Sequence, residues 1–333
     1  MYTGRFGDIY YRHYGSGSPV LLLHTLEPSA NMSEWIAAAT ELGKSHSVYV
    51  IDLPGCGFSD KSTIDYSIYM YALAVNDFIK NRILRHHDTA TGIHAAAIST
   101  STAILICAAL TAPKLYSGLS FINPQAMETT YCNPSTKPVF AKCIRAVYNT
   151  PVIGSFMYNL KYNRAAIMDR LSKVSGLEVA QKNELADSMY EAAHTGGYYG
   201  RFLLASIHGN LLNSDIARML SKLSTPILIV TGSADRQAKK ALPLISTRKI
   251  YPPSFLKISA PHSLNVLTSL PEYSTASSIK YLKTEYYEPD TSQFINCGVS
   301  GSLLFNTEIT NHNSYCYTLS AYCSGSFAGS PAF

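Results

Sequence analysis

The chain has 333 residues, of which 47% are hydrophobic and 15% charged, so it is long enough to bury a large core as one α/β domain or as one domain with an insertion. The formal net charge of +5 is modest and is not concentrated in a basic run, which argues against a nucleic-acid-binding protein. The start of the chain lacks the apolar segment of a signal peptide, and no apolar stretch reaches the roughly 18 unbroken residues expected of a membrane span.

The cysteines are scattered, and none of them forms a Cys-x-x-Cys pair. Their odd number and irregular spacing predict reduced thiols in a cytoplasmic protein and give no support to a zinc site. The seven cysteines are Cys56, Cys107, Cys132, Cys143, Cys297, Cys316 and Cys323.

The first 124 residues alternate between short apolar runs, which are typical of buried parallel strands, and segments with helical spacing. The predicted strands are 8–14, which ends at a hairpin-like break, 19–24, 47–53, 89–98 and 116–123; the predicted helices are 33–42, 66–84 and 101–112. Strand and helix alternate about every 25 to 30 residues, which predicts an α/β fold with a parallel sheet and right-handed crossovers.

This alternation stops after residue 124. Residues 125–223 show only helical segments rich in Tyr, Ala and Met, which predicts an all-helical cap, and caps usually cover a site. The α/β pattern returns over residues 224–285, with strands at 226–232 and 255–259 and a helix near 271–282. Residues 286–333 are nearly free of charge and are interpreted as an appendage of unknown role, either poorly ordered or with a few extra strands.

A cluster of small residues separates one apolar run from the next. In the segment Ala97-Ile98-Ser99-Thr100-Ser101, small side chains stand two positions before and two positions after Ser99. A nucleophilic serine on a strand-to-helix turn needs such neighbours, because the two backbones nearly touch there. By itself the cluster also fits a helix N-cap, which is the commoner use of neighbouring Ser and Thr residues.

Over residues 8–282 the chain resembles the α/β-hydrolase family. The resemblance is carried by five landmarks in order, namely Leu23-His24, the segment Asp52-Leu53-Pro54-Gly55-Cys56-Gly57-Phe58-Ser59-Asp60-Lys61, the turn around Ser99, Gly232-Ser233-Ala234-Asp235 and Ala260-Pro261-His262. It implies a mostly parallel central sheet flanked by helices, with the helical cap inserted into it. It also implies a serine hydrolase.

The resemblance assigns a catalytic triad to this chain. The family places a nucleophile after its fifth strand, an acid after the seventh and a histidine after the eighth, which are here Ser99, Asp235 and His262. The histidine would take the serine proton and return it to the leaving group, and the aspartate would orient the histidine. Glu128 is the alternative acid, because some members carry theirs after the sixth strand. Since such a triad is self-sufficient, no metal or organic cofactor is implied.

The resemblance also implies two backbone N–H groups that would stabilise the oxyanion. One belongs to Thr100, directly after the nucleophile, and the other to Leu26, in the loop after the third strand of the family. Losing one such donor typically weakens transition-state stabilisation by about 2.7–4 kcal/mol, so the conformation of this loop matters.

The chain departs from the family pattern at three positions where glycine is usual, which here are Thr25, Ala97 and Ser101. A β-branched Thr25 disfavours a positive φ, so we expect an oxyanion loop of altered shape. Glu27 adds a carboxylate near the expected mouth of the site, which is expected to disfavour anionic substrates.

Four further residues are candidates for a substrate pocket. His24 is interpreted mainly as a residue that orders the oxyanion loop, with Thr25 beside it. In the predicted cap, His194 and Tyr198 flank the pair Gly196-Gly197. Packing within the cap beside a mobile turn is the favoured interpretation of these two side chains, and a polar pocket wall is the alternative.

The sequence therefore predicts a cytoplasmic serine hydrolase that cleaves a small to medium, largely apolar ester, thioester or amide through a Ser99 acyl-enzyme. A small-molecule substrate is the only partner implied, and the oligomeric state is left open. Dehalogenase and epoxide hydrolase chemistry would need an aspartate at position 99. Acyltransferase and C–C hydrolase chemistry use the same triad and remain alternatives. A further alternative is a weak or inactive member that binds a small molecule, and a separate one is an interaction role for residues 286–333.

Overall fold

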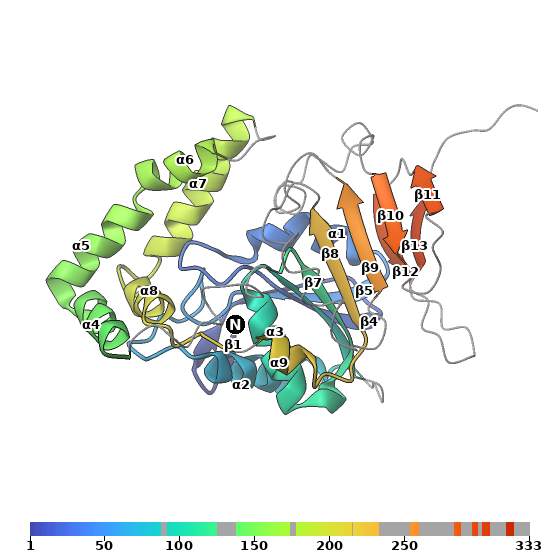
Figure 1. Cartoon of the computed structure of the whole chain (residues 1–333), viewed down its shortest axis with the longest axis horizontal. Coiled ribbons are helices and arrows are strands. Elements are labelled where there is room, and N and C mark those ends of the chain that lie inside the picture. The colour runs from blue at the N-terminus through green and yellow to red at the C-terminus, as the bar shows by residue number, and fades with distance from the viewer. Residues whose placement is uncertain are drawn as a thin grey trace, which may run out of the picture.

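The computed structural model of the protein describes most of the first 232 residues and a set of strands beyond them (Figure 1). The described residues are 1–87, 92–124, 138–173, 178–214, 216–232, 254–259, 283–287, 295–298, 302–306 and 318–322. The predicted helix near 271–282 lies outside these ranges.

A single mixed sheet runs through the centre of the molecule. Its strands are β3 (Tyr11–Tyr14), β4 (Ser18–Leu23), β5 (His46–Ile51), β6 (Ile93–Ile98), β7 (Tyr116–Ile122), β8 (Ile227–Gly232), β9 (Ser254–Ser259), β10 (Lys283–Tyr287) and β11 (Ile295–Gly298). They are ordered β11-β10-β9-β8-β7-β6-β4-β5-β3. All neighbours from β5 to β9 pair in parallel, whereas β3 and β10 pair antiparallel with β5 and β9. The predicted α/β class with a mostly parallel sheet is confirmed.

Strand β4 shows why an apolar run predicts a strand of this sheet. Leu21 and Leu23 belong to one buried cluster and Leu22 to another, because successive side chains of a strand point to opposite faces. Both faces are covered by helices, so both need apolar residues. Burying one such leucine contributes about 1.5–3 kcal/mol.

Helices cover both faces of the sheet. They are the 3-10 helix η1 (Met32–Trp35) with α1 (Ile36–Leu42), α2 (Ile68–Phe78) with the π-helical turn η2 (Ile79–Ile83), and α3 (Ser101–Thr111). Trp35 and Leu42 pack in the cluster of Leu22, while α2 and α3 pack in the other cluster. The helices predicted at 33–42, 66–84 and 101–112 are thus present with small shifts at their ends.

The N-terminal strand differs from its prediction. The run 8–14 is not one strand: β2 (Gly7–Ile9) pairs with β1 (Tyr2–Gly4) in a separate two-stranded sheet, and β3 joins the central sheet. The division falls at Tyr10, whose N–H donates to Ser59 Oγ (2.8 Å) and whose carbonyl accepts from Asp52 N–H (2.9 Å). The prediction of a hairpin-like break after residue 14 was also wrong. The strands on either side of it, β3 and β4, do not pair with each other but lie on opposite sides of β5.

Between β7 and β8 the chain forms a group of helices on one side of the sheet (Figure 1). We call α4 (Pro138–Asn149), α5 (Pro151–Tyr162), α6 (Arg164–Ser172), α7 (Val179–His194) and α8 (Gly200–His208) the helical insertion; α9 (Ile216–Leu220) follows and packs on α3. Within the described part of 125–223 every regular element is a helix. That these helices serve as a cap over a site remains a proposal.

Side-chain hydrogen bonds hold the helical insertion against loops of the central sheet. Asn31, in the loop after β4, donates from Nδ2 to Ser188 Oγ on α7 (3.2 Å). The N–H of Tyr66 donates to Ser206 Oγ on α8 (2.9 Å). These contacts place α7 and α8 beside the loops that leave the carboxyl ends of β4 and β5.

The C-terminal residues add strands to this architecture. Strands β10 and β11 extend the central sheet at one edge, while β12 (Ser302–Asn306) and β13 (Thr318–Tyr322) form a separate antiparallel pair. Extra strands were one of the two interpretations of residues 286–333. Among the described helices, none combines the length and apolar character needed to cross a membrane.

Candidate active site

Ser99 occupies the turn between β6 and α3 in a left-handed backbone conformation. Its φ is +54°, and the residue is only 2% exposed. An L-residue other than glycine is strained in this region, and such strain concentrates at functional turns. The N–H of Ser99 donates to the carbonyl of Ile122 at the end of β7 (2.9 Å), which fastens the turn to the sheet. A nucleophile elbow requires such a turn between a strand and a helix, so we call residues 97–101 the elbow, while the role of Ser99 as nucleophile stays a prediction.

The small residues two positions before and two positions after Ser99 are both buried. Ala97 is fully buried on β6. Ser101, also fully buried, donates from Oγ to the carbonyl of His24 at the end of β4. A serine at the place of the usual glycine therefore has a hydrogen-bond partner, and it links the elbow to the neighbouring strand.

The loop after β4 contacts the elbow directly. The N–H of Leu26 donates to Oγ1 of Thr100 (3.0 Å), and the same hydroxyl lies 3.4 Å from the carbonyl of Leu26. The Thr100 oxygen thus occupies the position at which the Leu26 N–H would meet an oxyanion. Within the described part of the chain, the Thr100 N–H, at the start of α3, has no hydrogen-bond acceptor, as is usual for the first N–H groups of a helix.

Thr25 does not distort this loop in the expected way. In the described residues a positive φ outside glycine occurs at Ser99, Asn123 and Asn210, so Thr25 avoids the left-handed region. Its N–H donates to Oε2 of Glu34 (2.8 Å), which leaves Leu26 as the residue whose N–H faces the elbow. Burial raises the pKa of Glu34, and the Thr25 N–H opposes that rise.

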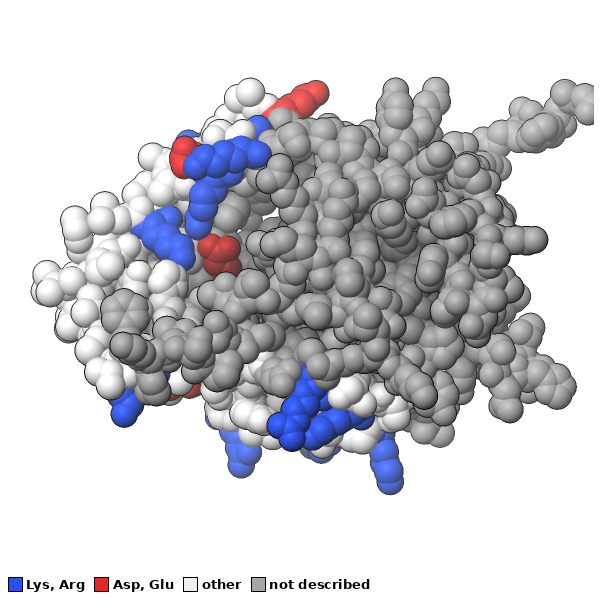
Figure 2. All heavy atoms as spheres, viewed as in Figure 1, with Lys and Arg blue, Asp and Glu red and all other residues white. Residues whose placement is uncertain are grey.

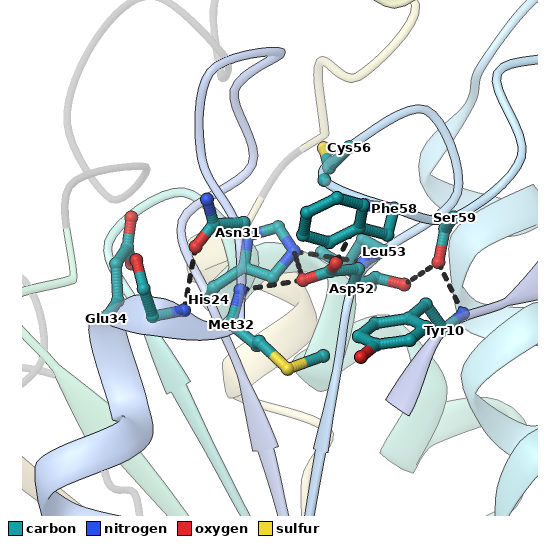
Figure 3. Close-up of polar contacts among 12 residues, drawn as sticks. Tyr10, His24, Asn31, Met32, Glu34, Asp52, Leu53, Cys56, Phe58 and Ser59 are labelled. Carbon is teal, nitrogen blue, oxygen red and sulfur yellow. Dashed lines mark hydrogen bonds and ion pairs between the residues drawn. The ribbon is translucent and has the colours of Figure 1, made fainter. Parts of the chain in front are cut away.

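His24 joins the loop after β4 to the loop after β5, and Figure 3 shows its ring beside Leu53 and Asp52. It is fully buried, its Nδ1 lies 2.7 Å from the carbonyl of Thr25, and its Nε2 accepts from the N–H of Leu53 (2.9 Å). Because Leu53 offers a donor, Nε2 carries no proton, and the ring is the neutral tautomer with its proton on Nδ1. Both ring nitrogens are therefore engaged in joining the loop after β4 to the loop after β5.

Asp52 also connects these loops, a role that was not predicted from the sequence. Its carboxylate accepts from the N–H of Met32 (2.6 Å) and of Phe58 (2.9 Å) (Figure 3). Gly57 has φ +50°, and a Cβ there would lie 2.2 Å from the carboxylate. Burial raises the pKa of Asp52, although the two N–H donors oppose the rise. The motif at 52–61 is thus a turn built around a buried carboxylate.

The other two triad candidates lie outside the described residues, as does Glu128. The chain leaves β8 at Gly232, three residues before Asp235, and leaves β9 at Ser259, three residues before His262. Because β6 to β9 are parallel neighbours, both exits lie at the edge of the sheet that carries Ser99. The triad itself stays a prediction.

His194 and Tyr198 belong to an aromatic group within the helical insertion. His194 stacks on Tyr190 with ring centroids 4.2 Å apart, and it meets Tyr198 edge to face at 5.8 Å. Tyr198 is 43% exposed. These ring contacts lie within the helical insertion, and both interpretations of the pair stay predictions.

Two more observations concern the chemistry that the site offers. The thiol of Cys56 donates to the carbonyl of Glu27 (3.3 Å), and burial raises its pKa, so it is held as a thiol and not as a thiolate nucleophile. Among the described residues, no group of three or more His, Cys, Asp or Glu side chains is placed to hold a metal ion. The absence of a cofactor stays a prediction.

Comparison with protein families matches residues 18–240 to the α/β-hydrolase fold. The match covers more than half of the chain, so the chain belongs to the α/β-hydrolase fold family. No curated protein sequence is significantly similar to it.

Solved structures of the same fold include several hydrolases. A thermophilic esterase from Thermogutta terrifontis has 17% identity and a TM-score of 0.59, covering 80% of this chain and 89% of that chain. The enol-lactonase from Burkholderia xenovorans LB400 has 14% identity and a TM-score of 0.56, covering 78% and 91%. A hydrolase from Oleispira antarctica has 21% identity and a TM-score of 0.52, covering 79% and 90%. At these identities the likeness concerns the fold alone.

Proposed function

We propose that the protein is a serine hydrolase that cleaves a small to medium, largely apolar ester, thioester or amide. The single observation that carries this proposal is the left-handed backbone of Ser99, on a turn that also brings Thr100 against Leu26. A strained serine between a parallel strand and a helix is the position from which this family performs acyl transfer. Esterase and lactonase activities among proteins of this fold are consistent with that class of reaction.

In the proposed reaction, Oγ of Ser99 attacks the substrate carbonyl while His262 takes the serine proton. His262 then gives that proton to the leaving group, and Asp235 keeps its imidazole oriented. The acyl-enzyme is hydrolysed by water in a second half-reaction with the same roles. Each step uses groups of this chain and water, with no cofactor.

The oxyanion of the tetrahedral intermediate would be held by the N–H groups of Leu26 and Thr100. For this the hydroxyl of Thr100 must turn away from Leu26, since it now accepts that hydrogen bond. A side-chain rotation is enough, because the Thr100 N–H lies on the fixed first turn of α3. The exchange replaces one acceptor of the Leu26 N–H by another, so the donor need not lose its hydrogen bond.

The test is covalent labelling with a fluorophosphonate probe, followed by peptide mass spectrometry. The wild type is expected to form one adduct, on Ser99, and to hydrolyse short p-nitrophenyl esters. Ser99→Ala is expected to do neither. His262→Asn and Asp235→Asn are expected to bind the esters but to lose most of kcat. A folded wild type that is neither labelled nor active contradicts the proposal.

The hydrogen bond between Leu26 and Thr100 also supports one other candidate function. If the Thr100 hydroxyl keeps the Leu26 N–H occupied, the protein binds an ester or related small molecule without acylation. Such a protein would retain ester binding by calorimetry while failing to react with the fluorophosphonate. An acyltransferase would be labelled, and would transfer the acyl group to an added alcohol faster than to water.

A further inference from the structure

One edge of an arginine side chain in the helical insertion faces no acceptor in the described part of the chain. Arg170 on α6 approaches the loop after β4, where its Nη1 lies 3.0 Å from Oε1 of Glu27, 143 residues away in the chain. Its guanidinium also lies over the ring of Tyr162, 5.2 Å from the centroid. The Nε and Nη2 atoms are shielded from solvent and have no hydrogen-bond partner among the described residues.

These two atoms form a single binding edge. Nε–H and Nη2–H point in parallel from one side of the planar guanidinium, and this spacing matches the two oxygens of a carboxylate. Glu27 uses Nη1 instead and leaves that edge open. A guanidinium N–H that is buried without an acceptor is unfavourable, so the arrangement favours a ligand that supplies one.

The charges around Arg170 also favour an additional anion. Lys161 on α5 lies near the same tyrosine ring, with Nζ 5.5 Å from the centroid. It contacts His208 (3.1 Å), and it forms no ion pair with a carboxylate of the described residues. Burial lowers the pKa of Lys161, Glu27 opposes that shift, and Arg170 adds to it. Two cations thus share one described carboxylate, that of Glu27. Figure 2 shows basic and acidic side chains gathered over the region where Figure 1 places α6 and α7.

This edge lies close to the proposed site of reaction. Glu27 follows Leu26 directly, and Leu26 contacts Thr100 beside Ser99. One loop therefore contacts both Arg170, through Glu27, and the turn at Ser99, through Leu26. Because Arg170 pairs with Glu27, the Glu27 carboxylate does not act alone on an approaching anion.

We propose that the Nε–Nη2 edge of Arg170 binds a carboxylate group of the substrate. The substrate is then an otherwise apolar ester, thioester or amide that carries one carboxylate. This inference rests on the proposed function for the reaction, but the carboxylate site is defined by Arg170 independently of Ser99. The Arg170 side chain is 34% exposed, so part of it reaches solvent and can shift as substrate enters.

The kinetic test compares esters that differ only in a carboxylate. On the acyl side, p-nitrophenyl hydrogen adipate is paired with methyl p-nitrophenyl adipate. On the alcohol side, 3-carboxyphenyl butyrate is paired with 3-carbamoylphenyl butyrate. For at least one pair, the wild type is expected to show a kcat/KM about 10- to 100-fold higher for the acid, mainly through a lower KM, as charge-assisted hydrogen bonds give.

Three variants distinguish the effect of the bidentate Arg170 edge from the effect of its positive charge. Arg170→Gln is expected to abolish the preference for the acid, measured in that variant as the ratio of kcat/KM for the acid to kcat/KM for the neutral ester. Arg170→Lys keeps the charge without the edge and is expected to retain a minor part of the preference. Arg164→Gln is the matched control, because Arg164 lies on the same helix and pairs at the surface with Asp187 (2.6 Å). It is expected to keep the full preference.

Binding measured without turnover distinguishes this inference from the proposed function. Ser99→Ala is titrated by calorimetry with adipate and with 3-carboxyphenyl butyrate, alone and combined with Arg170→Gln. Binding to Ser99→Ala that requires Arg170 supports the carboxylate site. If the wild type hydrolyses none of the esters, the same binding result supports the carboxylate site and refutes the hydrolase. Hydrolysis of neutral esters without a preference for acids, or a preference that survives Arg170→Gln, overturns the carboxylate site.

Discussion

The backbone N–H of Leu26 and the hydroxyl of Thr100 lie 3.0 Å apart, and this hydrogen bond joins two loops that are 74 residues apart in the chain. It sets the distance between the strained turn at Ser99 and the loop after β4. Beside it, Ser101 makes a second link from α3 to the carbonyl of His24. The hydroxyl groups of Thr100 and Ser101, the two residues that follow Ser99, thus connect the elbow to the loop after β4.

The first prediction concerns the strain at Ser99. Glycine adopts a positive φ without the steric penalty that a Cβ brings, so Ser99→Gly should relieve strain that Ser99→Ala retains. We expect Ser99→Gly to be more stable than Ser99→Ala by about 1 kcal/mol, with both variants inactive. Urea unfolding followed by circular dichroism measures the difference. Equal stabilities for the two variants would show that the turn is unstrained.

The second prediction concerns the hydroxyl of Thr100. Thr100→Val keeps the shape of the side chain but removes the acceptor of the Leu26 N–H. We expect a loss of about 1 kcal/mol in the free energy of unfolding, with Thr100→Ser close to the wild type because it keeps the hydroxyl. Fluorophosphonate labelling of Ser99 should persist in both, since the backbone N–H of Thr100 is unchanged. A Thr100→Ser variant as unstable as Thr100→Val would assign the effect to packing instead.

The third prediction concerns the close approach of Gly57 to Asp52. In Gly57→Ala the new Cβ would lie 2.2 Å from the carboxylate, so the turn must move in addition to bearing a strained φ. Gly196 is a matched control, because it also has a positive φ but a Cβ added there would meet no described atom within 4 Å. We expect Gly196→Ala to lose about 1 kcal/mol and Gly57→Ala clearly more. Thermal unfolding of the two variants in parallel provides the comparison, and similar losses would refute the steric argument.

The fourth prediction is a pH dependence that arises from Glu34. Burial raises its pKa in the folded protein, so between the unfolded and folded pKa values the folded state binds more protons. The contribution of Glu34 to stability is therefore largest below its ordinary pKa and falls as the pH rises through the raised value. Glu34→Gln removes this titration and keeps an oxygen acceptor for the Thr25 N–H.

We therefore expect Glu34→Gln to gain stability relative to the wild type as the pH is raised from 4 towards 8. Urea unfolding at several pH values in that range measures the difference. Glu41→Gln is the control, because Glu41 pairs with Lys44 on the surface. A difference between Glu34→Gln and the wild type that is constant with pH would contradict the assigned role of burial.

Some features of the fold and site follow from local sequence pattern. Strands β4 and β5 are buried on both faces, so nearly every position must be apolar, and this leaves continuous runs that are visible without a structure. The turn at Ser99 needs small neighbours because a strand and a helix meet there, and Ala97 and Ser101 satisfy that need. Such requirements act on adjacent residues, and that is why the sequence alone could reveal them.

Other features depend on partners far away in the chain. Tyr10 interrupts the strand predicted over 8–14 because its backbone pairs with Ser59 and Asp52, and no local pattern marks this change. The altered loop predicted from Thr25 is not observed. Its N–H donates to Glu34, and its φ is not positive. At Tyr10 the hydrogen bonds formed on folding outweigh the local strand pattern, whereas Thr25 keeps the backbone region that its β-branched side chain prefers.

The sequence by itself determined the α/β class, the order of strands and helices, and Ser99 as the residue on the turn, because apolar periodicity and the size of adjacent side chains are local properties. The tertiary structure decided that Thr100 meets Leu26 and that Arg170 reaches Glu27. Those contacts depend on how the helical insertion and the loops fold back onto the sheet. The local sequence around Arg170 does not indicate that its side chain pairs with a carboxylate 143 residues away.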